Sequence, residues 1–430
     1  MICTLVIAIL SILGMLACLL FHPAIRIGRF AFSTFYWPPL IGLAILLITG
    51  NVSGSEYLSG LVQDGSMNPL EILILFFSMA FLSTVLDEVG FFSFLADKAV
   101  AKAKGSQTAL FFFLYGLCSI LTMFTSNDIV IISFTPFLLF FAKDAKVNPI
   151  PYLLGEFVAA NTWSMLFIFG NPTNVYLASA FGLSFGEYFS HMWLPTLLAG
   201  SVSLGVMLLL FWKDLKAPMD VHPGFSKIQN RFVLISSLSI LLSVVALMAL
   251  SSYIRLPMWL FSLVGAGALL LLLLGQALLK REKPALLWSS CKRLPFSLAP
   301  FLLAMFGIVM GLTQAGITER IGSFLSQGEP VLSYGLSSFA AANVMNNLPM
   351  SVLYSGLLPS SGAYQKALYA TIASSNLGAI LTPVGALAGI LWMRILKSHG
   401  VDFSFAKFCC YGALISIPTL FASLSPLFFL

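Results

Sequence analysis

The chain has 430 residues, of which 59% are hydrophobic and only 9% are charged. A soluble protein carries about 25% charged residues, so this composition excludes an ordinary water-soluble domain and predicts a helical membrane protein. The net charge of +6 does not indicate nucleic-acid binding, because the Lys and Arg residues lie in short loops between apolar runs, where they set membrane orientation.

The apolar runs are mostly about 17–25 residues long, which suits helices that cross ~30 Å of hydrocarbon. They lack the alternation of a transmembrane barrel. The first run has no basic segment before it and no small-residue cleavage site, so we expect a retained helix. In chain order the predicted spans are 2–21, 32–49, 70–86, 188–212, 231–250, 257–279, 295–312 and 404–428.

The distribution of basic residues predicts the orientation of these spans. The loop 50–69 contains no Lys or Arg, whereas such residues gather at 98–104, 143–146, 213–231 and 280–293. Cytoplasmic loops are enriched in Lys and Arg. We therefore expect a multi-pass protein of the cytoplasmic (inner) membrane with its N-terminus outside. A basic cytoplasmic linker at about 280–294 falls within the second half.

Two segments read as re-entrant hairpins. Residues 107–142 lie between two basic clusters, so this segment enters the membrane and returns to the same side, with its turn at Ser126-Asn127-Asp128. Residues 330–358 form the second predicted hairpin, which enters from the opposite side and turns at Asn346-Asn347. Each turn places polar residues inside an apolar run.

A long apolar segment broken by polar residues, Pro and Gly follows each hairpin. The first, 149–182, breaks at 170–174, and the second, 363–397, breaks at 381–385. The spacing from Asn161 to Gly170 equals that from Asn376 to Gly385. Residues 1–212 and 213–430 are therefore predicted to be inverted-topology repeats, which are typical of secondary transporters. The predicted fold class is an all-α polytopic membrane protein in which each repeat contains a re-entrant helical hairpin and a discontinuous transmembrane helix.

The four breaks predict one shared cavity near the membrane midplane, since a helix can break there only where protein or a water-filled cavity supplies hydrogen-bond partners. Asn or Thr before Pro suits the start of a helix, whose free N–H groups can face a polar or anionic solute. The residues predicted to bind the solute are Ser126, Asn127, Asn171, Thr173, Asn174, Asn346, Asn347, Asn376 and Thr382.

Asp128 is the predicted ion-coupling residue. A charge at membrane depth is costly, so a carboxylate there has a functional role by default. Burial favours the protonated form of a carboxylate, which suits a proton carrier. The second hairpin has no charge at its turn. Glu156, beyond Pro151, is instead expected to extend toward the cytoplasm.

The sequence does not favour a metal site, a cofactor or an enzyme. The six Cys residues lack metal-ligand spacing, and Cys118 reads as a packing residue. An intramembrane aspartyl hydrolase needs two close carboxylates, and only Asp128 is clearly deep. A Ser–His mechanism needs a buried histidine, and all four histidines map to loops or span ends. We predict no catalytic residues and no resident metal.

At these residues the chain resembles the ArsB-type arsenite permeases, within a superfamily that includes NhaD-type sodium/proton antiporters and dicarboxylate carriers. The resembling elements are Asn127-Asp128, 170–174, Asn346-Asn347-Leu348-Pro349 and 375–378 with Thr382-Pro383. The resemblance implies a scaffold domain, a transport domain with two hairpins, ion-coupled alternating access and a homodimer. The chain departs from the dicarboxylate carriers, which have Ser-Asn-Thr at both hairpin turns.

Two transport functions remain. The first is proton-coupled efflux of arsenite or antimonite, with Asp128 as the proton site. Arsenite is mostly the neutral trihydroxide at neutral pH, which suits a cavity of Asn and Thr side chains. The alternative is a sodium- or proton-coupled transporter of a small oxyanion or dicarboxylate, in which helix N-termini hold the anion. The expected partners are thus a small solute, a coupling proton or sodium ion, and the lipid bilayer.

Overall fold

The protein is described here from a computed structural model, which describes residues 1–22, 24–27, 30–62, 68–217, 219, 227–358 and 364–430. Seven helices in these residues are long and apolar enough to cross a membrane, or eight if the bent pair Leu298–Gln314 and Ile317–Leu325 counts as one span. The prediction of an all-α polytopic membrane protein is confirmed.

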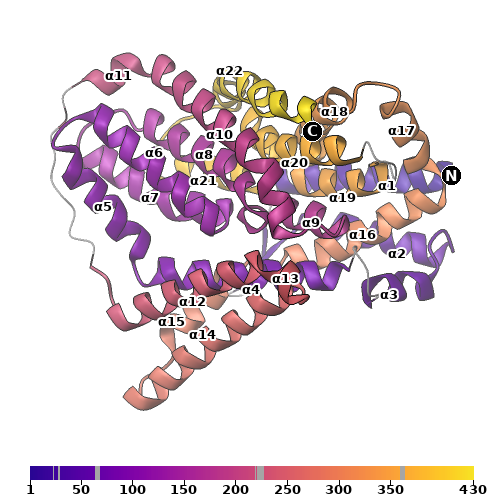
Figure 1. Cartoon of the computed structure of the whole chain (residues 1–430), viewed down its shortest axis with the longest axis horizontal. Helices are drawn as coiled ribbons and strands as arrows, with labels where there is room; N and C mark the ends of the chain where they lie inside the picture. The colour runs from indigo at the N-terminus through magenta and orange to yellow at the C-terminus, as the bar shows by residue number, and fades with distance from the viewer. Residues whose placement is uncertain (23, 28–29, 63–67, 218, 220–226, 359–363) are drawn as a thin grey trace.

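One group of helices lies along one side of the molecule, in the lower and right-hand part of Figure 1. Within it α1 packs on α2, α2 on α16, and α4 on α14, which also contacts α12. We call this group the scaffold. Its members are α1 (Ile2–Phe21), α2 (Trp37–Ile48), α4 (Pro69–Glu88), α12 (Arg231–Ala249), α14 (Met258–Lys280) and α16 (Leu298–Gln314).

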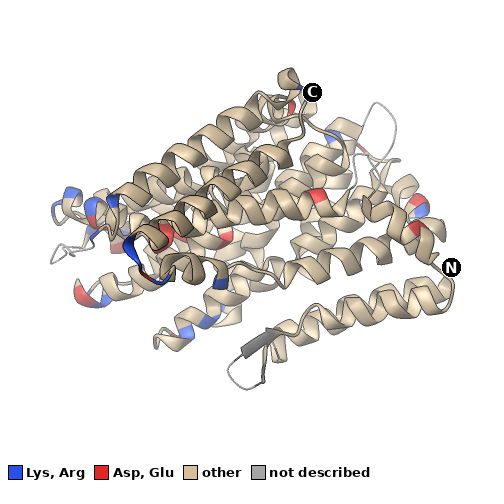
Figure 2. Ribbon diagram, turned by 90° about the horizontal axis from the view of Figure 1, so that it is seen from below, with Lys and Arg blue, Asp and Glu red and all other residues tan. Residues whose placement is uncertain are grey.

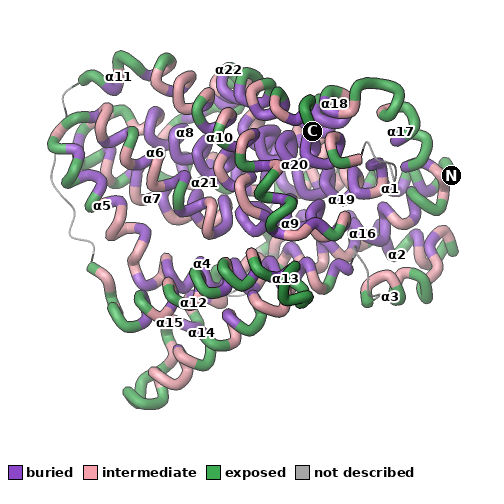
Figure 3. The backbone as a smooth tube through the Cα atoms, in the orientation of Figure 1, coloured by how far each residue is buried: buried purple, intermediate pink, exposed green. Residues whose placement is uncertain are grey.

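The second group, which we call the core bundle, contains both predicted hairpins and both broken segments. In it α6 packs on α8, α18 on α20, and α10 on α22. Figure 3 shows buried residues concentrated here, whereas much of α14 is exposed. Its members are α6 (Gln107–Phe124), α7 (Asn127–Asp144), α8 (Ile150–Trp163), α9 (Pro172–Ala180), α10 (Phe185–Leu210), α18 (Pro330–Met345), α19 (Asn347–Leu357), α20 (Tyr364–Leu381), α21 (Leu387–Ser398) and α22 (Phe405–Leu424).

Short elements connect these helices. The short helices are α3 (Gly54–Val62), α5 (Phe91–Ala103), α11 (Trp212–Lys216), α13 (Ser251–Ile254), α15 (Ala285–Lys292) and α17 (Ile317–Leu325), and the 3₁₀ turns are η1 (Ser164–Leu166), η2 (Ile168–Gly170), η3 (Pro383–Gly385) and η4 (Ser425–Phe429).

A two-stranded hairpin precedes α2, where the sequence predicted that a span had already begun. β1 (Ala24–Ile27) pairs antiparallel with β2 (Phe30–Ser33), with Ala24 opposite Ser33. The helix therefore starts at Trp37 and not at residue 32, and with 12 residues it is shorter than the helices that can cross a membrane, in place of the span predicted at 32–49. Pro38 and Pro39 then fall in the first turn of α2, where a missing N–H removes no helical hydrogen bond.

The same order of elements occurs twice in the chain. Each copy consists of a scaffold helix, a short helix, a hairpin, a broken segment and a long helix. The first copy runs from α4 to α10 and the second from α16 to α22. Both short helices, α5 and α17, begin after a glycine with positive φ, Gly90 and Gly316. The repeated order covers 69–210 and 298–424, and the division into inverted repeats 1–212 and 213–430 stays a prediction. Residues 63–67, in the predicted outer loop, and residue 363, the predicted start of the second broken helix, lie outside the described residues.

Lys and Arg residues gather at one end of the helices, away from the N-terminus (Figure 2). We call it the basic end and define it by residues 98–104, 143–146, 213–216 and 280–293. The start of α1 and the pair Glu319 and Arg320 lie at the opposite end. The helices therefore run between a basic end and an end with few positive charges.

Two glycines allow the backbone to fold tightly at the breaks. A Cβ on Gly170 would overlap the Ser164 carbonyl oxygen, and one on Gly385 would overlap the Gly378 carbonyl oxygen. Only a residue without a side chain permits this approach. Gly170 and Gly385 are therefore positions of close backbone packing.

Gly170→Ala should destabilise the protein by about 1–3 kcal/mol, because the added methyl group must displace backbone at a buried break. A lower Tm in detergent is the expected result. Gly205→Ala is the matched control, since Gly205 lies in α10 and a Cβ there meets no atom within 4 Å. An unchanged Tm for Gly170→Ala would contradict the packing argument.

Candidate functional site

Four helices begin around one small cavity. The first turns of α7, α9, α19 and α21 all contribute to its wall, together with the start of α16. Its volume is about 20 Å³. The lining residues are Asp128, Asn171, Pro172, Thr173, Leu298, Asn346, Asn347, Leu348, Ala386 and Leu387. The predicted convergence of the breaks is therefore present in the fold, and five predicted site residues meet there: Asp128, Asn171, Thr173, Asn346 and Asn347.

Each of these helix ends carries unpaired backbone N–H groups and a partial positive charge. Asn171 caps α9 by accepting a hydrogen bond from the Thr173 N–H at 3.1 Å. Asn346 caps α19 by accepting from the Leu348 N–H at 3.4 Å. Ser126, which precedes α7, makes no such bond. The cavity thus lies in a positive field with Asp128 as its carboxylate.

No α-helix starts at Thr382-Pro383, where the sequence predicts a helix start. A 3₁₀ turn occupies Pro383–Gly385, and α21 begins at Leu387 after Ala386, which has no capping side chain. The Thr382 hydroxyl donates to Asn343 Oδ1 at 2.7 Å. Thr382 therefore holds the second break against α18 and does not line the small cavity.

The turn of the first hairpin is fixed by a pair of asparagines. Asn127 Nδ2 donates to Asn161 Oδ1 at 3.1 Å, and Asn161 Nδ2 donates to the Phe157 carbonyl oxygen. Both side chains are buried. Asn127 thus connects the hairpin to α8 and does not line the small cavity.

Asn376 links the broken segments of the two halves. Its Oδ1 accepts from Asn171 Nδ2 at 2.9 Å and from Ser164 Oγ at 3.0 Å. Its Nδ2 donates to Asn174 Oδ1 at 2.6 Å. Asn174 Nδ2 in turn donates to the Ser164 carbonyl oxygen. We call these four residues the amide network; all are at least 98% buried.

The second hairpin is attached to the second break. Asn346 Nδ2 donates to the Val384 carbonyl oxygen at 2.9 Å. Asn346 itself has φ +75° and ψ +151°, outside the left-handed helical region and in one that residues other than glycine rarely adopt. The turn at Asn346 therefore combines a strained backbone with a side chain held at both ends.

Several polar atoms at the site have no hydrogen-bond partner among the described residues. They include Ser126 Oγ, Asn127 Oδ1 and Thr173 Oγ1, all buried. An unpaired buried polar atom costs about 1–3 kcal/mol, so such atoms normally have a water or solute as partner. The site therefore has unused hydrogen-bonding capacity at three of the predicted residues.

Asp128 also lines a larger cavity of about 290 Å³, which reaches Arg293 of the basic end. Ser126, Ile129 and Ile132 line it from the first hairpin, and Leu387 and Arg394 from α21. Scaffold residues, including Phe76 of α4 and Leu298 of α16, form the opposite wall. Asp128 lies where the two cavities adjoin, and no hydrogen bond or ion pair joins its carboxylate to another described residue.

An ion-pair cluster borders this larger cavity at the basic end. Arg293 Nη1 lies 2.6 Å from Asp87 Oδ2 and 2.9 Å from Glu88 Oε1. Arg293 Nη2 donates to Ser133 Oγ, which donates to Asp87. Since Ser133 belongs to α7 and the carboxylates belong to α4, we call these four residues the scaffold–hairpin clasp. The sequence predicts Arg293 only as part of a cytoplasmic loop and gives no sign that its guanidinium pairs with Asp87 and Glu88.

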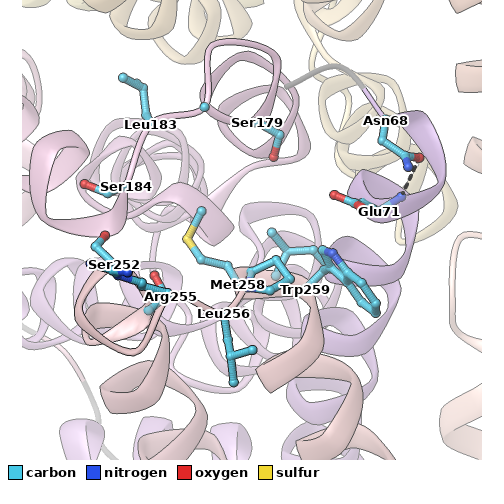
Figure 4. Close-up of a pocket in the computed structure, with 14 residues that line it drawn as sticks. Asn68, Glu71, Ser179, Leu183, Ser184, Ser252, Arg255, Leu256, Met258 and Trp259 are labelled. Carbon is cyan, nitrogen blue, oxygen red and sulfur yellow. Dashed lines mark hydrogen bonds between the residues drawn. The ribbon is translucent and has the colours of Figure 1, made fainter. Parts of the chain in front are cut away.

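A third cavity, of about 340 Å³, lies at the other end of α4. Asn68, Glu71, Arg255 and Trp259 approach it from the scaffold and its connector α13, and Ser179 and Ser184 from the core bundle (Figure 4). It shares no lining residue with the other two cavities. It therefore marks a second gap between the scaffold and the core bundle.

Three residues outside the predicted set also organise the site: Asn161, Ser164 and Asn343. Asn161 occupies the position equivalent to Asn376 in the repeat spacing, and that spacing was a usable signal. Ser164 and Asn343 carry no comparable signal, because isolated polar residues in helices are commonly structural. Glu156 does not extend toward the cytoplasm: it is 2% exposed and contacts Thr135. No group of three or more His, Cys, Asp or Glu side chains in the described part of the chain could hold a metal.

Comparison with known proteins identifies the class. Residues 1–373 match the family model "Citrate transporter", so the chain belongs to that family. It is 26% identical to the "Putative arsenical pump membrane protein" of Bacillus subtilis (strain 168), over 91% of this chain and 93% of the relative. It is also 26% identical to the "Arsenical pump membrane protein" of Escherichia coli (strain K12), over 91% and 92%.

The fold is similar to that of the solved YdaH transporter of Alcanivorax borkumensis, with a TM-score of 0.59 and 14% identity over 99% of this chain and 96% of that one. The protein is therefore a membrane transporter, and the predicted resemblance to the arsenite permease and citrate transporter group is confirmed. It belongs to a family of transporters.

Asn376→Ala should destabilise the protein strongly, because it removes the partner of Asn171 Nδ2 and of Asn174 Oδ1 and one of the two acceptors of the Ser164 hydroxyl. Each unpaired buried group costs about 1–3 kcal/mol. A large fall in Tm and loss of transport are expected. Ser375→Ala is the control: its hydroxyl is equally buried but already unpaired, so its removal should leave Tm unchanged. Equal Tm values for the two variants would refute the central place of Asn376 in the network.

Proposed function

We propose that the protein is a secondary active transporter that exports arsenite or antimonite across the cytoplasmic membrane in exchange for protons. The observation that carries this proposal is the convergence of four helix N-termini, amide and hydroxyl groups and one carboxylate on a single cavity. The names of the relatives support the substrate class, since two of them are arsenical pump membrane proteins.

The size of the small cavity favours a small solute. A cavity of about 20 Å³ has room for roughly one water molecule. A trihydroxide needs only a modest separation of the hairpin turns, whereas a citrate ion would require much larger movement. The hydroxyls of arsenite can both donate to and accept from Asn171, Asn347 and Thr173, which a carboxylate cannot do.

In the proposed mechanism Asp128 couples the two fluxes. Its carboxylate faces both cavities and lacks a positive partner in the described residues. When protonated, Asp128 adds a hydrogen-bond donor to the site, and when deprotonated it adds a negative charge. In this proposal the solute and the proton at Asp128 therefore compete for binding. The sodium-coupled alternative differs here, because a carboxylate would then ligate the ion directly.

The orientation follows from the basic end. Lys and Arg enrichment marks cytoplasmic loops, so we assign the basic end to the cytoplasm and the N-terminus to the outside (Figure 2). The cavity of about 290 Å³ then opens inward, and this conformation is ready to load solute from the cytoplasm. Movement of the core bundle against the scaffold would connect the small cavity to the outside through the gap at the third cavity, of about 340 Å³. The inverted repeats 1–212 and 213–430 and a homodimer are part of this proposal.

A second candidate is transport of a small oxyanion or dicarboxylate. Arg293 and Arg394 line the larger cavity, and the matching family model is that of a citrate transporter. Two guanidinium groups would attract an anion to the site. The clasp already occupies Arg293 with two carboxylates, which leaves Arg394 as the cation with the greater freedom to meet an anion.

Transport into inside-out vesicles under an imposed pH gradient tests both substrate and coupling. We expect arsenite to accumulate in response to the gradient, and citrate and succinate not to accumulate with or without sodium. Accumulation of a dicarboxylate, or no movement of arsenite, would replace the first candidate with the second.

Asp128→Asn should reduce gradient-driven arsenite accumulation to the level of protein-free vesicles, because a carboxamide neither binds nor releases a proton at this site. Arsenite exchange without a gradient should persist. Asp144→Asn is the matched control, since Asp144 is an exposed carboxylate on the same helix. Full gradient-driven transport by Asp128→Asn would remove the coupling role.

A further inference from the structure

A second carboxyl group is buried inside the core bundle, away from both cavities. Glu156 of α8 is 2% exposed and lies against α7. Its two oxygens are 3.0 and 3.2 Å from the Thr135 hydroxyl, which is itself fully buried. The side chain lines none of the cavities described above.

The hydrogen-bond geometry indicates which of the two groups carries the proton. Thr135 Oγ1 has one hydrogen, and its nearest acceptor is the Ile131 carbonyl oxygen at 2.6 Å, one helical turn back. A hydroxyl that donates there can only accept at its lone pairs. With its hydrogen directed at the closer acceptor, Ile131, the Thr135 hydroxyl offers Glu156 mainly its lone pairs, and a carboxylic acid at Glu156 that donates to Thr135 fits this geometry.

The surroundings of Glu156 contain no compensating positive charge. Cys118 of α6 is close enough to interact electrostatically with Glu156, and no Lys, Arg or His of the described residues forms an ion pair with Glu156. The titratable groups of the neighbouring α10 and α20 are engaged elsewhere: Glu187 with Ser184, Tyr188 with Met165, His191 with Tyr369, and Lys366 with Phe428. Burying an ionised carboxylate without a partner is strongly unfavourable, which agrees with the acid form.

The contact partner of Glu156 lies next to the scaffold–hairpin clasp. Thr135 is two residues from Ser133, which bonds to Asp87 and Arg293. Pro136 follows, and its missing N–H leaves the helix free to bend at this point. A movement of α7 that opens the clasp would therefore also move the Thr135 hydroxyl.

We propose that Glu156 is a second proton-binding site, occupied in this conformation and emptied when α7 moves. On release the Glu156 O–H bond breaks, the proton passes to water admitted between α7 and α8, and the carboxylate is left hydrated. The proposal rests on proton-coupled transport as the function, and it assigns one coupled proton to a group that does not touch the solute.

Infrared spectroscopy of the purified protein tests occupancy without any substrate. We expect a carboxylic-acid C=O band that shifts on deuteration, is absent in Glu156→Gln and is retained in Asp128→Asn. Thr135→Val removes the acceptor and should move the band to higher wavenumber, as for an acid with a free O–H. A spectrum without a band that Glu156→Gln removes would overturn the proposal, whatever the transported solute proves to be.

Release of the proton is tested by counting protons per arsenite in proteoliposomes. Glu156→Gln should lower the ratio by one while arsenite exchange continues, and Thr135→Val reports on the same site should Glu156→Gln not fold. An unchanged ratio with the infrared band lost would mean that the proton stays on Glu156, and the release step would be wrong. Failure of arsenite to move in the wild type would instead refute the proposed function and leave the infrared result standing.

Discussion

Unpaired backbone groups are the constraint on which this structure depends. In hydrocarbon a broken helix is stable only where protein or water supplies the hydrogen bonds that the break leaves open. Helices are interrupted at four places in this protein, and the four interruptions lie together around one cavity, so that each is shielded from lipid by the others. Asn171, Asn174 and Asn346 hydrogen-bond to backbone groups at three of these breaks. The site is thus a product of the same requirement that stabilises the fold.

Predicted site residues separate into two roles once their contacts are known. Asn171, Asn346 and Asn347 reach the small cavity, while Asn174 and Asn376 complete the amide network behind it. Asn171 does both, since its amide group contacts Asn376 and its position lines the cavity. Substitutions in the network and in the cavity wall therefore have different consequences: the first changes stability, and the second changes what the cavity holds.

The sequence predicts the hairpins, the broken segments and their repeat, because composition, basic loops and polar turns each report on membrane position. It placed Asp128 at the turn for the same reason. It could not place Arg293 beside Asp87 and Glu88, because that contact joins residues some two hundred positions apart. It misjudged Glu156, because a carboxylate near an expected span end reads as solvated, and only packing against α7 shows that it is enclosed. The strand pair before α2 was missed because a run of aromatic residues there resembles the start of a span.

The bond between Asn171 and Asn376 has a consequence for how the protein can move. Any motion that separates the first break from the second must first expose four amide and hydroxyl groups in a region without bulk water. In the proposed transport cycle the two broken segments would therefore move together, and sliding of the core bundle past the scaffold would break fewer of these hydrogen bonds than a hinge between the two halves of the chain. The contact of Asn171 with Asn376 would thus favour an elevator motion over a rocking motion.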